Sequence, residues 1–189
     1  MGQSAPSRIQ PRETSTEPSI LSIFRTNLGW FGLLGRKNRL VSITAGHLSE
    51  VEVRRAAAVK SEIDGLSEPI PEVDWNPDLR RRLEQYALGA PVEFLDFDLE
   101  LPPTTDFQRR VLNATRRIRY GKTLTYGQLA EKAGFPRAAR GVGTVMSSNR
   151  FPIVIPCHRV VASGGKPGGY SSPQGVSLKL RLLAMEAEG

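Results

Sequence analysis

Two signals for the start of a helix, both in the C-terminal half, constrain the fold of this chain more than any other feature. Residues 105–108 and 125–128 both read Thr-x-x-Gln, a capping box whose two side chains satisfy backbone N–H groups at a helix start. Residues 134–136, Gly-Phe-Pro, then break the chain, and proline suits the first position of a new helix. After the second box the pattern predicts two short helices, the later one running toward Ser148, joined as a helix-turn-helix.

Charge is divided unevenly along the 189 residues. Residues 1–104 carry 12 Lys and Arg against 15 Asp and Glu, a net charge of −3, whereas residues 105–189 carry 14 against 4, a net charge of +10. A helix-turn-helix inside a segment this basic predicts a polyanionic partner, most simply DNA that meets the second helix. The alternative is a basic face that only contacts solvent.

A chain of this length can hold one ordinary domain or two small ones. Residues 1–20 are rich in Ser, Thr, Pro, Gln and Glu, and we expect them to form a disordered tail. The change of charge and of helix content divides the remainder near residue 102. We therefore predict a mixed α/β (α+β) fold, with a small sheet-plus-helix domain over 21–101 and a mainly helical domain, containing the helix-turn-helix, over 102–189.

The acidic N-terminal domain contains signals for both strands and helices. Two β-rich runs flank residues 35–38 and predict a hairpin. Residues 76–89 begin with Asn-Pro and end with Gly, as a capped helix does. Residues 91–101 alternate apolar and acidic side chains, which predicts a strand with one buried face. We expect Trp30 and Trp75 in the core of this domain.

The helices of the basic domain are expected to present arginines and glycines. Residues 105–118 place apolar side chains on one helical face, and the opposite face carries Arg109, Arg110, Arg116 and Arg117. The second helix of the helix-turn-helix contains Gly141 and Gly143, which helix propensity disfavours. They allow close approach of DNA or close packing of another helix. Residues 164–169, Gly-Gly-Lys-Pro-Gly-Gly, lack the spacing of a phosphate-binding loop, and we predict a mobile loop there.

The single cysteine, Cys157, stands directly before one of the two histidines, His158. One cysteine excludes a disulfide within the chain and a cysteine-rich zinc site, and we expect neither a metal nor a cofactor. A thiol becomes a nucleophile where a base or a cation draws its proton away, and Arg159 follows the histidine. An inert, buried cysteine is the alternative. The other histidine, His47, is expected in a surface turn without a partner.

Nothing in the sequence indicates a membrane protein or export. No stretch approaches the ~20 apolar residues that a membrane span needs. The N-terminal residues lack the apolar core of a secretory signal. The expected location is the cytoplasm, or the nucleus in a eukaryotic cell.

Five short motifs occur in a fixed order in the basic domain. They are TYGQLA at 125–130, AARGVG at 138–143, IPCHRVV at 155–161, GGYS at 168–171 and LLAMEAEG at 182–189. This series resembles the O6-alkylguanine-DNA alkyltransferases, the methylated-DNA–protein-cysteine methyltransferases. The resemblance is dense over residues 102–189, whereas the preceding domain resembles the family's variable N-terminal domain only in size and position.

The resemblance implies DNA repair in a single irreversible step. The family flips the damaged guanine of double-stranded DNA into a pocket, because the O6-alkyl group is out of reach in the base stack. A cysteine then takes the alkyl group as a thioether, so each molecule reacts once, without a cofactor, and we expect a monomer. Cys157 is then the acceptor, and His158 draws the thiol proton away through a water. Glu186, rather than the neighbouring Glu188, orients the histidine.

The same resemblance implies residues for DNA binding and for the substrate pocket. Tyr126 matches the tyrosine that presses on the phosphate of the target nucleotide. Arg140 matches the arginine that fills the vacated stack, where a planar guanidinium can both stack and donate hydrogen bonds. Asn149 matches a residue that bonds the turn around the active-site loop. The pocket residues by this resemblance are Pro152, Val160, Tyr170 and Ser171.

Three departures from the family pattern lie near the site without touching its chemical core. Arg119 and Arg150 stand where the family usually has proline, and residues 172–175 form a run that is one residue longer than usual. The longer run leaves open which bulky alkyl groups the rim of the pocket accepts. The sequence also leaves open whether O4-methylthymine is repaired.

Two other functions remain open on the sequence. One is a lesion-binding or regulatory helix-turn-helix protein whose cysteine accepts no alkyl group, although some relatives of that kind have replaced the cysteine that Cys157 retains. The other is a cysteine hydrolase, which needs a separate histidine and an oxyanion hole. His47 is the only other histidine, and it belongs to the other domain.

Overall fold

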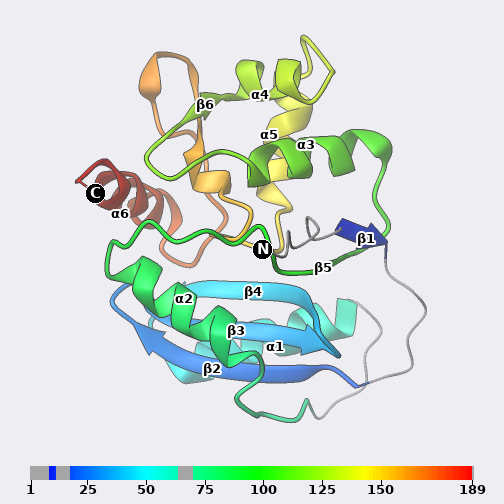
Figure 1. Cartoon of the computed structure of the whole chain (residues 1–189), viewed down its shortest axis with the longest axis vertical. Helices are drawn as coiled ribbons and strands as arrows, with labels where there is room; N and C mark the ends of the chain where they lie inside the picture. The colour runs from blue at the N-terminus through cyan, green and yellow to red at the C-terminus, as the bar shows by residue number, and fades with distance from the viewer. Residues whose placement is uncertain (1–8, 12–17, 64–69, 189) are drawn as a thin grey trace, which may run out of the picture. The chain divides into compact units, whose positions relative to one another are not determined.

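The structure, a computed structural model, describes residues 9–11, 18–63 and 70–188. The chain divides into two compact units, unit 1 (Met1–Pro102) and unit 2 (Pro103–Gly189). Strands and helices occur in both units (Figure 1), so the predicted mixed α/β class is confirmed. The tail predicted over residues 1–20 lies mostly outside the described residues, but within it β1 (Ile9–Pro11) is a strand paired with β5.

Unit 1 is built on one five-stranded sheet. Besides β1, its strands are β2 (Ile20–Thr26), β3 (Gly29–Arg36), β4 (Arg39–His47) and β5 (Leu99–Leu101). The order is β1-β5-β4-β3-β2, with β2, β3 and β4 antiparallel and β5 parallel to both neighbours. The predicted hairpin joins β3 and β4. A second hairpin joins β2 and β3 through Asn27 and Leu28. It was not predicted because neither turn residue is a glycine; the glycine stands one position later, at Gly29 (φ 113°).

Two helices cover the sheet of unit 1. Helix α1 (Glu50–Ile63) packs on β3 and β4, and α2 (Pro77–Ala87) contacts β2. Figure 1 shows them on opposite faces of the sheet. Helix α2 confirms the predicted capping, since the Asn76 side chain accepts a hydrogen bond from the Leu79 amide at 3.0 Å. Helix α1 has no counterpart among the sequence predictions.

The strand predicted over residues 91–101 is mostly wrong, because only the last three of these residues are a strand. Residues 91–98 form turns and irregular backbone. Arg82 on α2 holds this segment through two 2.8 Å hydrogen bonds to the Asp96 carboxylate and one of 3.1 Å to the Glu93 carbonyl. Asp96, one of the acidic side chains that suggested the solvent face of a strand, is therefore the hydrogen-bond partner of an arginine on α2.

The tryptophan and histidine predictions for unit 1 have mixed outcomes. Trp75 is buried as predicted, and its indole lies against Gly35, where a side chain would have no room. Trp30 is only half-buried. His47 is not in a surface turn: it ends β4, is 9% exposed and places Nδ1 3.8 Å from Glu52 Oε2. His47 is paired with Trp30 of β3 across the sheet, and this pairing places it inside rather than on the surface.

Unit 2 contains the helix-turn-helix. Its elements are α3 (Asp106–Arg116), β6 (Leu124–Thr125), α4 (Tyr126–Lys132), α5 (Ala139–Ser147), β7 (Val160–Val161) and α6 (Gly175–Glu188), with two single turns η1 (Cys157–Arg159) and η2 (Ser163–Gly165). Both predicted capping boxes are present. Helices α4 and α5 form the predicted motif. Helix α5 starts at Ala139 rather than Pro136, because Arg137 takes a left-handed conformation (φ 72°) that extends the turn.

Packing within unit 2 explains one of the two glycines of α5 and shows that one arginine predicted on the surface of α3 is buried. A Cβ on Gly141 would lie 3.0 Å from the Phe107 ring, so this glycine allows close packing of α5 on α3. A Cβ on Gly143 would meet nothing within 4 Å. Arg116 is 7% exposed and does not share the exposed arginine face predicted for α3. No helix of the described residues is both long and apolar enough to cross a membrane.

Candidate active site

The loop between α5 and β7 places Cys157 through one asparagine. Asn149 Nδ2 donates hydrogen bonds to the Ile155 carbonyl at 2.8 Å and to Cys157 Sγ at 3.1 Å. Its Oδ1 accepts a hydrogen bond from the Phe151 amide at 3.0 Å. Within this loop Ile153 has a φ of 74°, a conformation that a β-branched residue rarely adopts. Asn149 therefore closes the loop and holds the sulfur at the same time.

Cys157 faces a cavity of about 290 Å³. The residues that line it are Tyr126, Gly143, Met146, Ser147, Cys157, Gly169, Tyr170 and Ser171. Tyr126 is the first residue of α4, and a methyl group on Gly168 would lie 2.9 Å from its hydroxyl oxygen. The helix-turn-helix and the 164–171 loop thus enclose the thiol from two sides.

The predicted pocket residues divide into two groups. Tyr170 and Ser171 line the cavity beside Cys157, together with Tyr126. Pro152 and Val160 are not among its lining residues. Val160 instead lies in β7, paired with Leu124 of β6 and fully buried. Gly143, Met146 and Ser147 of α5 take up the remaining wall, and sequence reasoning did not assign them to the pocket.

A buried hydrogen-bond network lies directly after the cysteine. His158 Nε2 is 2.8 Å from Glu186 Oε1. Arg159 Nε donates to both oxygens of the same carboxylate, at 3.1 Å and 2.9 Å, and its Nη2 donates to Oε1 at 2.9 Å. The Gly121 amide donates to Oε2 at 3.1 Å. Glu188, the alternative partner considered for the histidine, is exposed.

The charge state of this network follows from its burial and contacts. Burial would raise the pKa of Glu186, but hydrogen bonds from His158 and Arg159 outweigh it and lower the pKa to about 2. Burial also lowers the pKa of His158, against the opposing effect of Glu186. The histidine is therefore neutral at pH 7. Because an ionised carboxylate only accepts hydrogen bonds, Nε2 carries the proton and Nδ1 is the acceptor nitrogen.

Cys157 is a buried thiol with two groups nearby that favour its ionised form. Burial raises the pKa of Cys157, while the Asn149 hydrogen bond and the positive charge of Lys179 act in the opposite direction. Lys179 is fully buried and donates to the Val160 carbonyl at 2.6 Å and to the Gly169 carbonyl at 3.3 Å. The ammonium therefore connects the strand after the cysteine to the rim of the cavity.

Sequence reasoning did not assign Lys179 to the site, and it named Arg159 only as a cation next to His158, without a partner. A signal for Lys179 exists in α6, where Leu178, Leu182 and Glu186 recur every four residues and are all buried. A lysine next to this stripe is a candidate for a buried charge. For Arg159 the only signal is its place beside Cys157 and His158 in the sequence.

Arg140 lies apart from the cavity. It is the second residue of α5, in the first turn of that helix, and its side chain is exposed. It does not line the cavity beside Cys157. Its guanidinium makes no hydrogen bond or ion pair within the part of the chain that the structure describes. A long, unpaired cation thus projects from the second helix of the helix-turn-helix.

The arrangement contains the parts needed for nucleophilic chemistry by a thiol. Cys157 supplies the nucleophile, neutral His158 can accept a proton, and ionised Glu186 fixes the histidine tautomer. The described residues include no cluster of three or more His, Cys, Asp or Glu that could hold a metal ion. Fold and site together define the class of a helix-turn-helix protein with a cysteine nucleophile.

Comparison with known proteins narrows this class to one family. Residues 106–188 match the family model described as 6-O-methylguanine DNA methyltransferase, DNA binding domain. A methylated-DNA–protein-cysteine methyltransferase of Methanosarcina acetivorans is 44% identical over 128 residues, which cover 67% of this chain and 79% of that protein. The chain belongs to the methylated-DNA–protein-cysteine methyltransferase family.

The match to solved structures covers more of this chain than the sequence matches do. The crystal structure of Mycobacterium tuberculosis O6-methylguanine methyltransferase is 29% identical, with a TM-score of 0.73, and the match covers 90% of this chain and 93% of that one. The structure of Mycobacterium tuberculosis OGT in complex with DNA is 30% identical, with a TM-score of 0.71 and coverage of 89% and 92%. The likeness therefore includes unit 1 as well as unit 2.

Proposed function

We propose that this protein repairs DNA by transferring the alkyl group of O6-alkylguanine to Cys157, once per molecule. The observation that carries the proposal is the placement of the only cysteine against a cavity, directly before a buried histidine held by a carboxylate. Family membership supports the same chemistry. The enzyme is a methylated-DNA–[protein]-cysteine S-methyltransferase with a single turnover.

The proton of the thiol leaves first. In the resting site Cys157 is a neutral thiol because burial raises its pKa, and His158 is a neutral base. His158 Nδ1 accepts the thiol proton through a bridging water. The imidazolium that forms is stabilised by Glu186, which stays ionised at all pH values above its pKa of about 2. Lys179 and the Asn149 amide stabilise the thiolate.

The alkyl group then moves to sulfur in one displacement. A lone pair of Cys157 Sγ forms the new carbon–sulfur bond, while the bond between the alkyl carbon and O6 breaks. Its electron pair stays on the guanine, which takes up one proton to become the ordinary base, and this proton balances the one that His158 accepted from the thiol. A thioether is not a leaving group at neutral pH, and no group of the site can remove it, so the reaction ends there.

The lesion must leave the base stack to reach the sulfur. The partner is double-stranded DNA that carries O6-alkylguanine. The protein binds this DNA as a monomer through the helix-turn-helix. Tyr126, at the start of α4 and on the cavity wall, presses on the target phosphate. Arg140 enters the vacated stack from the first turn of α5. Tyr170 and Ser171 contact the flipped base inside the cavity. The cytoplasm, or the nucleus of a eukaryotic cell, is the location of this repair.

A titration tests the single turnover. The protein is mixed with an increasing excess of duplex DNA that contains O6-methylguanine, and repaired guanine is counted. Repair should stop at about one equivalent per protein molecule, because one thiol accepts one alkyl group. Repair far beyond one equivalent would overturn the proposal, and binding without any repair would favour a lesion-binding or regulatory protein.

A further inference from the structure

A second cavity in unit 2, which we call the basic pocket, lies outside the site described above. It has a volume of about 470 Å³ and is lined by Ala114, Arg117, Ile118, Arg119, Lys122, Thr123, Leu124 and Lys132. These residues come from the end of α3, the connection to β6, β6 itself and the end of α4. None of them lines the cavity beside Cys157.

Four of the eight lining residues are cations, and no acidic residue joins them. Arg117, Arg119, Lys122 and Lys132 are all exposed. Within the described ranges none of the four forms an ion pair or donates a side-chain hydrogen bond. Elsewhere on α3, Arg109 and Arg110 both pair with Asp106. The cations of the basic pocket are therefore available to an external anion.

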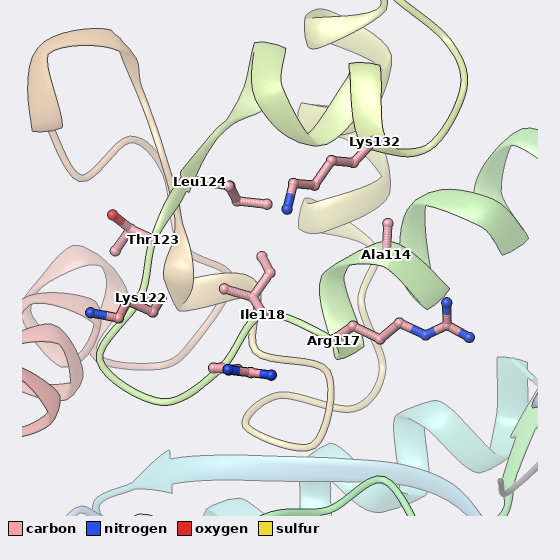
Figure 2. Close-up of a pocket in the computed structure, with 8 residues that line it drawn as sticks. Ala114, Arg117, Ile118, Lys122, Thr123, Leu124 and Lys132 are labelled. Atoms are coloured by element: carbon pink, nitrogen blue, oxygen red, sulfur yellow. The ribbon is translucent and has the colours of Figure 1, made fainter.

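The interior of the basic pocket is aliphatic. Figure 2 shows Ile118 and Leu124 in its middle, with the Lys132 side chain extending from α4 toward Leu124. In the same view Lys122 and Arg117 lie on opposite sides of this floor. Ile118 is buried, and Leu124 and Ala114 are half-buried. A surface of this kind contacts a flat or aliphatic group while the cations around it contact charges.

A single small anion would occupy only part of the basic pocket and would not contact all four cations. A volume of about 470 Å³ lies within the ~300–1,000 Å³ of small-molecule sites. Four separated cations match several negative oxygens, and both Arg and Lys bind phosphate groups. The aliphatic floor adds room for a ring. A nucleotide combines a chain of phosphate charges with a sugar and a flat base.

We propose that the basic pocket binds a nucleotide, with its phosphate groups on the four cations and its base or sugar on Ile118 and Leu124. The nucleotide is either free or a unit of a nucleic-acid strand. Residues of β6 separate this pocket from β7 and the segment of Cys157, because Leu124 pairs with Val160.

Amide NMR shifts of the full chain test the proposal with two probes, adenosine triphosphate and an undamaged 12-nucleotide single strand. Binding at the basic pocket should shift the amides of 117–124 and 132. The double variant Lys122→Glu, Lys132→Glu should weaken this binding about tenfold or more, since two charge-assisted contacts become repulsive. Lys122→Gln, Lys132→Gln should weaken it less. The matched control Arg181→Glu, an exposed cation on α6, should change it less than twofold.

The outcomes separate the two sources. Saturation by adenosine triphosphate indicates a free nucleotide, and shifts by the single strand alone indicate a strand passing the pocket. Shifts confined to Tyr126, Gly143 and Ser147, or none at 117–124 and 132 with either probe, would overturn the proposal. So would an equal loss in Arg181→Glu. Alkyl transfer to Cys157 is measured separately, so failure here leaves the proposed function untouched.

Discussion

Replacement of Glu186 by glutamine should destabilise unit 2 by about 3 kcal/mol at pH 7. Glu186 is 3% exposed, and its carboxylate accepts hydrogen bonds from His158, Arg159 and the Gly121 amide. A carboxyl whose pKa falls from 4.5 to about 2 has its ionised form stabilised by about 3 kcal/mol, at ~1.36 kcal/mol per pKa unit. The neutral amide loses this term and leaves Arg159 as a buried cation without its counter-charge.

The lowered pKa of Glu186 also predicts how the loss of stability depends on pH. The pKa of Glu186 is lower in the folded protein, so the unfolded chain binds the proton first as the pH falls. The contribution is complete above the unfolded pKa of 4.5 and is lost as the pH falls toward 2. By proton linkage, the difference between the wild-type protein and the variant should shrink from about 3 kcal/mol at pH 7 to about 1 kcal/mol at pH 3.

Urea unfolding at both pH values measures the difference. Far-UV circular dichroism is the suitable signal, because both tryptophans, Trp30 and Trp75, lie in unit 1. Glu188→Gln is the matched control on the same helix, and as an exposed change it should stay within about 0.5 kcal/mol. A Glu186→Gln effect below about 1 kcal/mol at pH 7, or one that is the same at pH 3, would refute the reasoning from linkage.

Three further predictions concern DNA binding and the loop of the cysteine. Arg140→Ala should slow repair of duplex DNA about tenfold or more, ~1.4 kcal/mol on the barrier, but scarcely affect reaction with free O6-benzylguanine; equal losses would contradict a role in base flipping. The logarithm of the DNA-binding constant should fall with log salt at a slope of about −4 to −5, as the release of counterions from four to six phosphates requires, whereas a flat profile would contradict binding through the basic unit. Asn149→Ala should slow both the duplex and the free-base reactions, measured as single-turnover rates, because Asn149 holds Sγ itself; a loss with duplex alone would contradict this.

The elements that depend on neighbouring residues in the sequence are the ones that could be predicted. Both capping boxes, the start of α2 at Asn76 and the turn between β3 and β4 are local, and all are present. Residues 91–98 show the limit, because Arg82 on α2 ties Asp96 into a loop although the alternation of side chains is that of a strand. His47 likewise becomes buried through its pairing with Trp30.

The residues of the candidate site also divide into those that the sequence could predict and those that it could not. Cys157 and His158 are adjacent in the sequence, and the motif series pointed to Glu186, which is hydrogen-bonded to the histidine although 28 residues away from it. Arg159 and Lys179 could not be assigned, because their roles depend on burial against distant carbonyl and carboxylate groups. The cavity wall formed by α5 depends in turn on how that helix packs, which no motif records.

The mass of the peptide that holds Cys157 tests the central claim most directly. Cleavage after Arg150 and Arg159 releases residues 151–159, which include the only cysteine of the chain. After incubation with duplex DNA containing O6-methylguanine, this peptide should gain ~14 Da, the mass of one methyl group in place of the thiol proton. Cys157→Ser should bind the same DNA and gain no mass. An unchanged peptide in the wild-type protein, or a methyl group on any other peptide, would contradict the account.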